Sequence, residues 1–223
     1  MDITNIRRIA KELNLHNIAK APLSLFESDL PKVDFLELIL KTELAERKAN
    51  NLYKARKASR LPKTSTLTKL ESVTEWQFNE LKKLHWIDDT KNLFIVGNCG
   101  SGKTELATTI GNCCLDSGYK VYYIKADQLI LPLKTKEAIP KAKKTYEYIK
   151  SCDLFIVDEF IYIMPTPEEL TLLYRALTFL SEAQSIIFIT NRELCEWTTT
   201  TEDKHLMQTL LSRITASSQI LKL

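Results

Sequence analysis

The pattern of apolar and polar positions divides the chain into two parts of different character. In the first part, apolar residues recur at helical spacing from Ile3 to Leu13, so residues 2–15 are predicted to form an amphipathic helix. Residues 32–60 contain no glycine or proline and carry an apolar stripe on their first half. They are predicted to form one long helix that ends before Pro62.

The second part alternates short apolar, β-prone runs with helical patterns. The predicted strands are Leu93–Val96, Val121–Ile124, Leu154–Val157 and Ile186–Thr190. The predicted helices between them are Thr104–Ser117, Lys141–Ser151 and Pro167–Ala183. Buried strands that alternate with helices predict an α/β domain with a mainly parallel sheet. A stretch rich in serine and threonine, residues 61–75, reads as a linker, which predicts a helical N-terminal domain over 1–68 and an α/β domain over 69–223.

Composition excludes several classes of protein. The 223 residues are 44% hydrophobic and 26% charged with only 5 glycines and 7 prolines, which excludes disordered and collagen-like chains. No apolar run approaches the roughly 20 residues that span a bilayer, so we expect a soluble, cytoplasmic protein without a membrane partner. The 5 cysteines form no C-x-x-C pair and the 3 histidines have no metal-ligand spacing, which argues against a disulfide framework and a zinc site.

Positive charge is concentrated in the first part of the chain. Residues 1–70 hold 14 Lys and Arg against 8 Asp and Glu, although the whole chain has a net charge of only +3. The excess lies in one stretch with seven basic and no acidic residues: Arg47, Lys48, Lys54, Arg56, Lys57, Arg60 and Lys63. This stretch is typical both of a solvated helix face and of a nucleic-acid contact. A secondary basic cluster comprises Lys134, Lys136, Lys141, Lys143 and Lys144.

A phosphate-binding motif directly follows the first predicted strand. Its eight residues match the pattern G-x-x-x-x-G-K-[ST] at every fixed position: Gly97-Asn98-Cys99-Gly100-Ser101-Gly102-Lys103-Thr104. A helix is predicted to begin at Thr104, where the motif ends. Backbone N–H groups of the loop and of the helix N-terminus are therefore expected to converge on a β-phosphate. Lys103 is predicted to reach the β- and γ-phosphate oxygens and Thr104 to ligate Mg²⁺.

Acidic and amide side chains follow two later strands. Asp158 ends the third predicted strand and is expected to hold Mg²⁺, while Glu159 is placed to polarise a water molecule for attack on the γ-phosphate. Such a second carboxylate is typical of a nucleotide hydrolase rather than of a small-molecule kinase. If the fourth strand lies between the first and third, Asn191 faces the γ-phosphate. The chain has no N-K-x-D guanine-reading motif, so ATP is the expected nucleotide.

With these elements in order, the chain resembles the AAA+ ATPases, and more closely the IstB-like branch that includes transposition helper ATPases and DnaC-type helicase loaders. The resemblance covers almost the whole chain. It is carried by the segments Ile6–Leu15, Phe35–Arg47, Gly102–Ala107, Gly118–Tyr123, Asp158–Tyr162, Thr190–Trp197 and Leu211–Ile214.

This resemblance implies a P-loop NTPase with an AAA+ core, a parallel sheet flanked by helices, and a small α-helical N-terminal domain. A C-terminal helical lid is not expected, because only ten residues follow Arg213. By the same resemblance, Asn191 is a sensor of the γ-phosphate, and Arg213 completes the site of a neighbouring subunit in a homo-oligomer with ATP at its interfaces. The implied cofactors are ATP and Mg²⁺.

The resemblance also implies partners. The function that it favours is a DNA-binding ATPase that assembles on DNA, with duplex preferred over single strands, and recruits or stimulates a transposase. One alternative is a loader for a replicative helicase. Another is an ATP-switched scaffold that hydrolyses little ATP.

Overall fold

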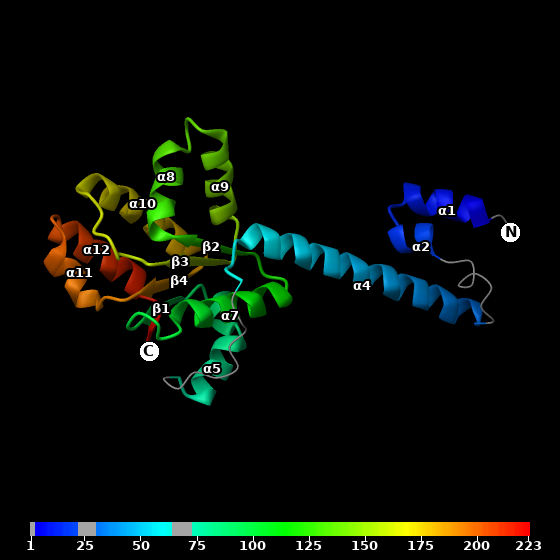
Figure 1. Ribbon diagram of the computed structural model, residues 1–223, viewed down its shortest axis with the longest axis horizontal. Helices are drawn as coiled ribbons and strands as arrows, with labels where there is room; N and C mark the ends of the chain where they lie inside the picture. The colour runs from blue at the N-terminus through cyan, green and yellow to red at the C-terminus, as the bar shows by residue number, and fades with distance from the viewer. Residues whose placement is uncertain (1–2, 22–29, 64–72) are drawn as a thin grey trace. The chain divides into compact units, whose positions relative to one another are not determined.

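The computed structural model describes residues 3–21, 30–63 and 73–223 and divides the chain into two units, Met1–Lys54 and Ala55–Leu223 (Figure 1). The predicted domain boundary at residue 68 and most of the predicted linker lie outside the described residues. No helix within the described ranges is both long enough and apolar enough to cross a bilayer.

The first unit is helical. It contains α1 (Ile3–Glu12), α2 (His16–Lys20) and most of α4 (Lys32–Ser59). The long helix therefore matches its prediction, but the prediction that the first helix reaches residue 15 is wrong. Helix α1 ends at Glu12, and Asn14 has a φ of 56°, in the left-handed region where the chain leaves the helix.

The second unit contains a five-stranded parallel sheet with strand order β2-β3-β4-β1-β5. Its strands are β1 (Asn92–Val96), β2 (Val121–Lys125), β3 (Leu154–Asp158), β4 (Ser185–Thr190) and β5 (Ser218–Lys222). The four predicted strands are confirmed to within one residue at each end. Strand β5 was not predicted: it is a short edge strand with several exposed residues, and only its pairing with β1 defines it.

Helices cover both faces of this sheet. The helices that lie wholly within this unit are α5 (Glu75–Lys82), α6 (His85–Asp88), α7 (Lys103–Asp116), α8 (Ala126–Thr135), α9 (Pro140–Lys150), α10 (Pro167–Ala183), α11 (Leu194–Thr200) and α12 (Lys204–Thr215). Helix α7 packs across four strands of one face, whereas α8 and α10 pack on β2 and β4 from the other (Figure 1). Helix α10 begins at its predicted residue, because Thr166 and Glu169 form a capping box ahead of Pro167.

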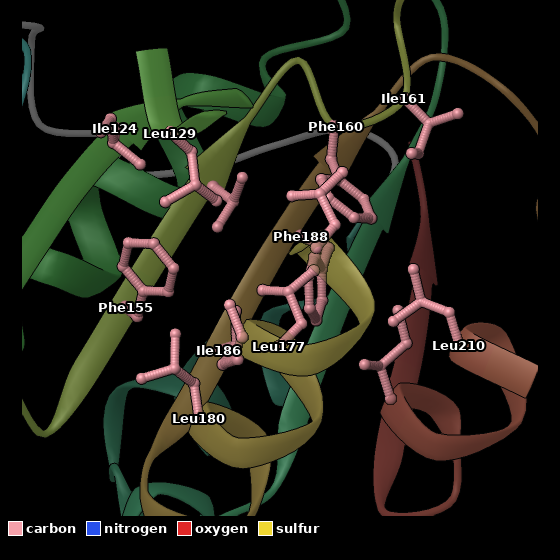
Figure 2. Close-up of a cluster of buried hydrophobic side chains, with 14 of the residues drawn as sticks. Ile124, Leu129, Phe155, Phe160, Ile161, Leu177, Leu180, Ile186, Phe188 and Leu210 are labelled. Atoms are coloured by element: carbon pink, nitrogen blue, oxygen red, sulfur yellow. The ribbon is translucent and has the colours of Figure 1, made fainter. Parts of the chain in front are cut away.

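Alternate residues of the strands form a hydrophobic core beneath α8, α10 and α12. Phe155, Ile186 and Phe188 of β3 and β4 belong to one buried cluster with Leu129 of α8, Leu177 of α10 and Leu210 of α12 (Figure 2). The intervening strand residues face α7, so every central strand is buried on both sides, as expected of a parallel sheet. This two-sided packing fixes the carboxyl ends of β1, β3 and β4 at one edge, which is where ligands of open α/β sheets bind.

Candidate nucleotide-binding site

A cavity of about 450 Å³ lies at this edge of the sheet. It is formed by the loop after β1, the first turn of α7 and the residues that follow β3 and β4. Its lining residues are Cys99, Gly100, Gly102, Lys103, Thr104, Glu105, Asp158, Glu159, Tyr162, Ile189, Thr190 and Asn191. The structure thus brings together, in one cavity, residues that the sequence placed in three separate segments.

Two glycines of the phosphate loop have distinct structural roles. Gly102 caps α7 with a φ of 87°, a conformation that side-chain-bearing residues rarely adopt. At Gly97, an added Cβ would lie only 2.5 Å from the backbone oxygen of Leu223 and 2.9 Å from the hydroxyl of Ser101. The loop is therefore shaped both by backbone conformation and by the close approach of a second segment, next to β5.

Lys103 closes the loop through its own side chain. Its Nζ donates hydrogen bonds to the backbone oxygens of Gly97, at 2.8 Å, and of Asn98, at 2.5 Å. Partial burial lowers the pKa of Lys103, although the nearby Cys99 and Asp158 act in the opposite direction. A phosphate group entering the cavity offers this ammonium a charged acceptor in place of two neutral carbonyls.

Asp158 is a buried carboxylate with three hydrogen-bond donors. Its Oδ1 accepts from the backbone N–H of Glu159 at 2.7 Å, and its Oδ2 accepts from the hydroxyls of Thr104 at 2.9 Å and Tyr123 at 2.6 Å. These bonds compensate the cost of burying the charge. The Thr104 hydroxyl and the Asp158 carboxylate thus place two oxygen atoms side by side. Oxygen atoms are the ligands that Mg²⁺ prefers.

Strand β2 contributes two side chains that sequence reasoning missed. Burial raises the pKa of Tyr123 far above its usual range, and the hydrogen bond to Asp158 adds to this shift. Two residues further along, Lys125 forms an ion pair with Glu159, with Nζ and Oε1 2.7 Å apart, and this hydrogen bond raises the pKa of Lys125. Tyr123 was in the predicted strand Val121–Ile124 and Lys125 directly followed it, but the pairing of β2 with β3 was not visible in the sequence.

Glu159 is held in an unusual backbone conformation. Its φ of 54° lies in the left-handed region, which is uncommon for residues other than glycine. The next residue anchors it: Phe160 is fully buried, donates its N–H to the backbone oxygen of Ile189 at 2.8 Å, and packs on Phe188 and Trp197. This anchor leaves the Glu159 side chain at the cavity.

Asn191 lies in the same cavity because of the strand order. Strand β4 is placed between β3 and β1, so its carboxyl end reaches the cavity between the phosphate loop and the two acidic residues. The fourth predicted strand therefore does lie between the first and the third, as the expectation for Asn191 required. Trp197, in the same sequence motif, is fully buried against Phe94 and Phe160 and belongs to the core.

Arg213 is placed apart from these residues. It is exposed near the end of α12 and does not line the cavity of its own chain.

The seven basic residues of the first cluster are divided between the two units. Arg47, Lys48 and Lys54 belong to the first unit and Arg56, Lys57, Arg60 and Lys63 to the second. All are exposed, but three have intramolecular contacts. Arg47 pairs with Glu43, Arg56 with Asp116, and the guanidinium of Arg60 lies 5.3 Å from the ring centroid of Tyr122. Within the described residues, the four lysines have no carboxylate partner within 4.0 Å.

The secondary lysine cluster lies on α8, on α9 and in the loop between them. Lys134 pairs with Glu169 at 2.9 Å, and the ammonium of Lys136 lies 3.9 Å from the ring centroid of Tyr146. The remaining three members, Lys141, Lys143 and Lys144, are exposed. No group of three or more His, Cys, Asp or Glu side chains suited to a metal ion occurs in the part of the chain that the structure describes.

Comparison with known sequences identifies a protein family that matches almost the whole chain. The family described as IstB-like ATP binding protein matches residues 8–223. An IS21-like insertion-sequence ATP-binding protein of Bacteroides fragilis is 29% identical over 96% of this chain and 85% of its own length. The corresponding protein of insertion sequence IS5376 from Geobacillus stearothermophilus is 30% identical over 85% of this chain and 78% of its own length.

Comparison with solved structures gives the same fold. The DnaC helicase loader superposes with a TM-score of 0.59 and 19% identity, over 76% of this chain and 98% of that one. AMPPCP-bound DnaA from Aquifex aeolicus superposes with a TM-score of 0.57 and 21% identity over 74% of this chain. The chain spans about half the length of that DnaA structure. These likenesses show that about three quarters of the chain has the AAA+ P-loop fold of DnaA and DnaC.

Proposed function

The chain belongs to the family of IstB-like ATP-binding proteins, and from this premise we propose that it is a Mg²⁺-dependent ATPase that assembles on DNA and recruits or stimulates the transposase of an insertion sequence. The observation that carries the hydrolytic part is the placement of Glu159 beside Asp158 in the cavity of the phosphate loop. A site that only bound ATP would need the loop and Asp158 but no second carboxylate.

The site residues of this cavity that were predicted from the sequence each have a role in this proposal. The N–H groups of the loop and the ammonium of Lys103 bind the β- and γ-phosphates. Thr104 and Asp158 hold Mg²⁺, which neutralises charge on the phosphates when it is bound. Glu159 accepts a hydrogen bond from the attacking water and orients it. Asn191 faces the γ-phosphate and helps to orient the same water.

Separate measurements of binding and hydrolysis test the enzymatic part. Lys103→Ala should weaken Mg·ATP binding, because a contact to the phosphates is lost. Glu159→Gln should bind Mg·ATP as the wild type does but release phosphate at least about 100-fold more slowly, since only the activation of water is lost. A Glu159→Gln variant that turns over at the wild-type rate would contradict the assignment, and a wild type with no turnover on DNA would favour the ATP-switched scaffold.

The four exposed lysines of the basic stretch support the proposed DNA contact. Each phosphate that they neutralise should steepen the dependence of log K on log [salt] by about 0.9 for duplex DNA. Replacing Lys54, Lys57 and Lys63 by glutamine should therefore reduce that slope by about 2 to 3. The same change at Lys141, Lys143 and Lys144 tests the secondary cluster, and whichever triple variant leaves the slope unchanged excludes its own cluster.

The likeness to DnaC keeps the helicase loader as a second candidate function. DnaC shares the fold over 98% of its solved chain. The two functions use the same chemistry but different partners. A pull-down of the ATP-bound protein against a cognate transposase and against a replicative helicase separates them, and binding to the helicase alone would overturn the transposition assignment.

A further inference from the structure

We propose that Tyr123 is a positioning residue for Mg²⁺, which acts by holding the Oδ2 oxygen of Asp158. This inference rests on the proposed function in one respect: it takes Thr104 and Asp158 as the residues that hold the metal. Tyr123 lies outside the phosphate loop and outside the acidic pair Asp158 and Glu159, and it does not line the cavity. Its effect must therefore pass through Asp158.

The topology of the sheet places Tyr123 beside Asp158. Strand β2 is the edge strand next to β3 and runs parallel to it, with Tyr123 opposite Ile156 and Lys125 opposite Asp158. Since side chains alternate along a strand, Tyr123 and Lys125 project from the same face, and each contacts an acidic residue at the end of β3. A one-residue change of register would turn the Tyr123 hydroxyl to the opposite face of the sheet.

The donors to Asp158 differ in what they are free to do when Mg²⁺ and ATP bind. Oδ1 is held by the backbone N–H of Glu159, at 2.7 Å. Oδ2 is held by two hydroxyls, of which that of Thr104 is itself a metal ligand in the proposed function. The hydroxyl of Tyr123, at 2.6 Å, is the other donor and stands outside the cavity. It fixes the direction in which Asp158 presents its oxygen.

Hydrogen-bond donors to a metal-holding carboxylate affect metal binding in proteins generally. Groups that hydrogen-bond to a metal-holding carboxylate orient it, and their removal typically lowers metal affinity or activity by about 10- to 100-fold. Here the orienting group is a buried phenol with a rigid ring, 8% exposed, packed in the sheet. Its hydroxyl has little freedom to move away from Asp158.

The adjacent residue provides a matched control. Tyr122 is also buried on β2, but it points to the opposite face, where it belongs to the core cluster and packs on the ring of Tyr148 with centroids 5.2 Å apart. Replacing either tyrosine by phenylalanine removes one buried hydroxyl from the same strand and keeps the ring. Only the change at 123 removes a donor to Asp158.

The test is the Mg²⁺ dependence of nucleotide binding, followed with a fluorescent, non-hydrolysable ATP analogue. In Tyr123→Phe, the Mg²⁺ concentration for half-maximal enhancement of binding should rise about 10-fold or more, with the affinity measured in EDTA unchanged. Tyr122→Phe should show the wild-type Mg²⁺ dependence. In an Asp158→Asn background, Tyr123→Phe should cause no further change. Melting temperatures of all variants, taken without metal, confirm that they are folded.

An unchanged Mg²⁺ dependence in Tyr123→Phe would overturn the proposal, as would an equal shift in Tyr122→Phe or a full further shift in the Asp158→Asn background. The readout is binding and not turnover, so it is independent of the proposed hydrolysis. A wild type that binds the analogue with Mg²⁺ but releases no phosphate from ATP would contradict the ATPase assignment and leave this test intact.

Discussion

The ammonium of Lys125 lies 2.7 Å from Oε1 of Glu159, the carboxylate proposed to activate water. Both side chains are about half exposed, at 42% and 50%, so the ion pair is a weak one that water and salt screen. Oε1 of Glu159 accepts a hydrogen bond from this ammonium, so that oxygen is already engaged in the nucleotide-free protein. The ion pair therefore competes with any water molecule for the same carboxylate oxygen.

Removal of this ion pair should raise the rate of ATP hydrolysis in the absence of DNA. We expect Lys125→Met to increase the basal rate by up to about fivefold, because an exposed pair is worth about 0.2–1 kcal/mol. The control is Lys91→Met, since Lys91 forms an ion pair of the same length with Asp89, a carboxylate that, unlike Glu159, does not line the cavity. A basal rate that falls in Lys125→Met would instead make Lys125 part of the catalytic machinery.

Arg213 should act on the nucleotide of a neighbouring subunit. Because it is exposed on α12 and absent from the cavity of its own chain, Arg213→Ala should leave ATP binding intact and reduce DNA-stimulated hydrolysis by about 10³-fold or more. Arg175, exposed on α10, is the matched control.

Mixing variants distinguishes a shared site from a local one. If Arg213 and Glu159 act across an interface, a mixture of Arg213→Ala and Glu159→Gln subunits should recover part of the activity, because some contacts pair an intact arginine with an intact glutamate. No recovery at any mixing ratio, with both variants assembled on DNA, would argue that Arg213 is an ordinary surface residue.

The cysteines should differ in reactivity according to their burial. Burial raises the pKa of Cys152 to about 12 and that of Cys114 further, so in the folded protein both remain protonated thiols at pH 8. Cys99 and Cys195 are exposed. We expect iodoacetamide at pH 8 to modify these two, and Mg·ATP to protect Cys99, which lines the cavity, but not Cys195. Peptide mass spectrometry would detect the sites, and unprotected Cys99 would place the nucleotide elsewhere.

Glu43 should make the first unit sensitive to acid. Burial alone would raise its pKa, but hydrogen bonds from the backbone N–H of Asn17 and from Arg47, each 3.0 Å long, lower the pKa below its ordinary 4.5. Because the pKa of Glu43 is lower in the folded than in the unfolded chain, its ionised carboxylate stabilises the fold fully above pH 4.5. This stabilisation is lost as the pH falls through the pKa that Glu43 has in the folded protein.

Hydrogen exchange in the full chain measures this effect. At pH 6 the Glu43→Gln variant should exchange the Asn17 amide about 10-fold or more faster than the wild type, since hydrogen bonds to charged groups contribute about 1.5–3 kcal/mol. Glu37→Gln, which removes an exposed i,i+4 partner of Lys41, is the control and should leave this amide unchanged. Equal exchange in Glu43→Gln and the wild type would contradict a stabilising role of the carboxylate.

The sequence by itself determined the local elements and the phosphate loop. Apolar periodicity placed four strands, the long helix α4 and helix α10, because two-sided burial demands continuous apolar runs and a capping box defines a helix start. The eight residues from Gly97 to Thr104 were recognisable because the loop, its glycines and its lysine are contiguous. Asp158 and Glu159 were found for the same reason, since they directly end a strand.

Only the tertiary structure decided which separate segments meet. The place of β4 between β3 and β1, which brings Asn191 to the cavity, depends on how helices pack on both faces of the sheet. The contacts of Tyr123 and Lys125 depend on the register of β2 with β3, and strand β5 exists only through its pairing with β1. Hydrogen bonds between strands join residues far apart in the chain and carry no local pattern, so the sequence showed these side chains but not their partners.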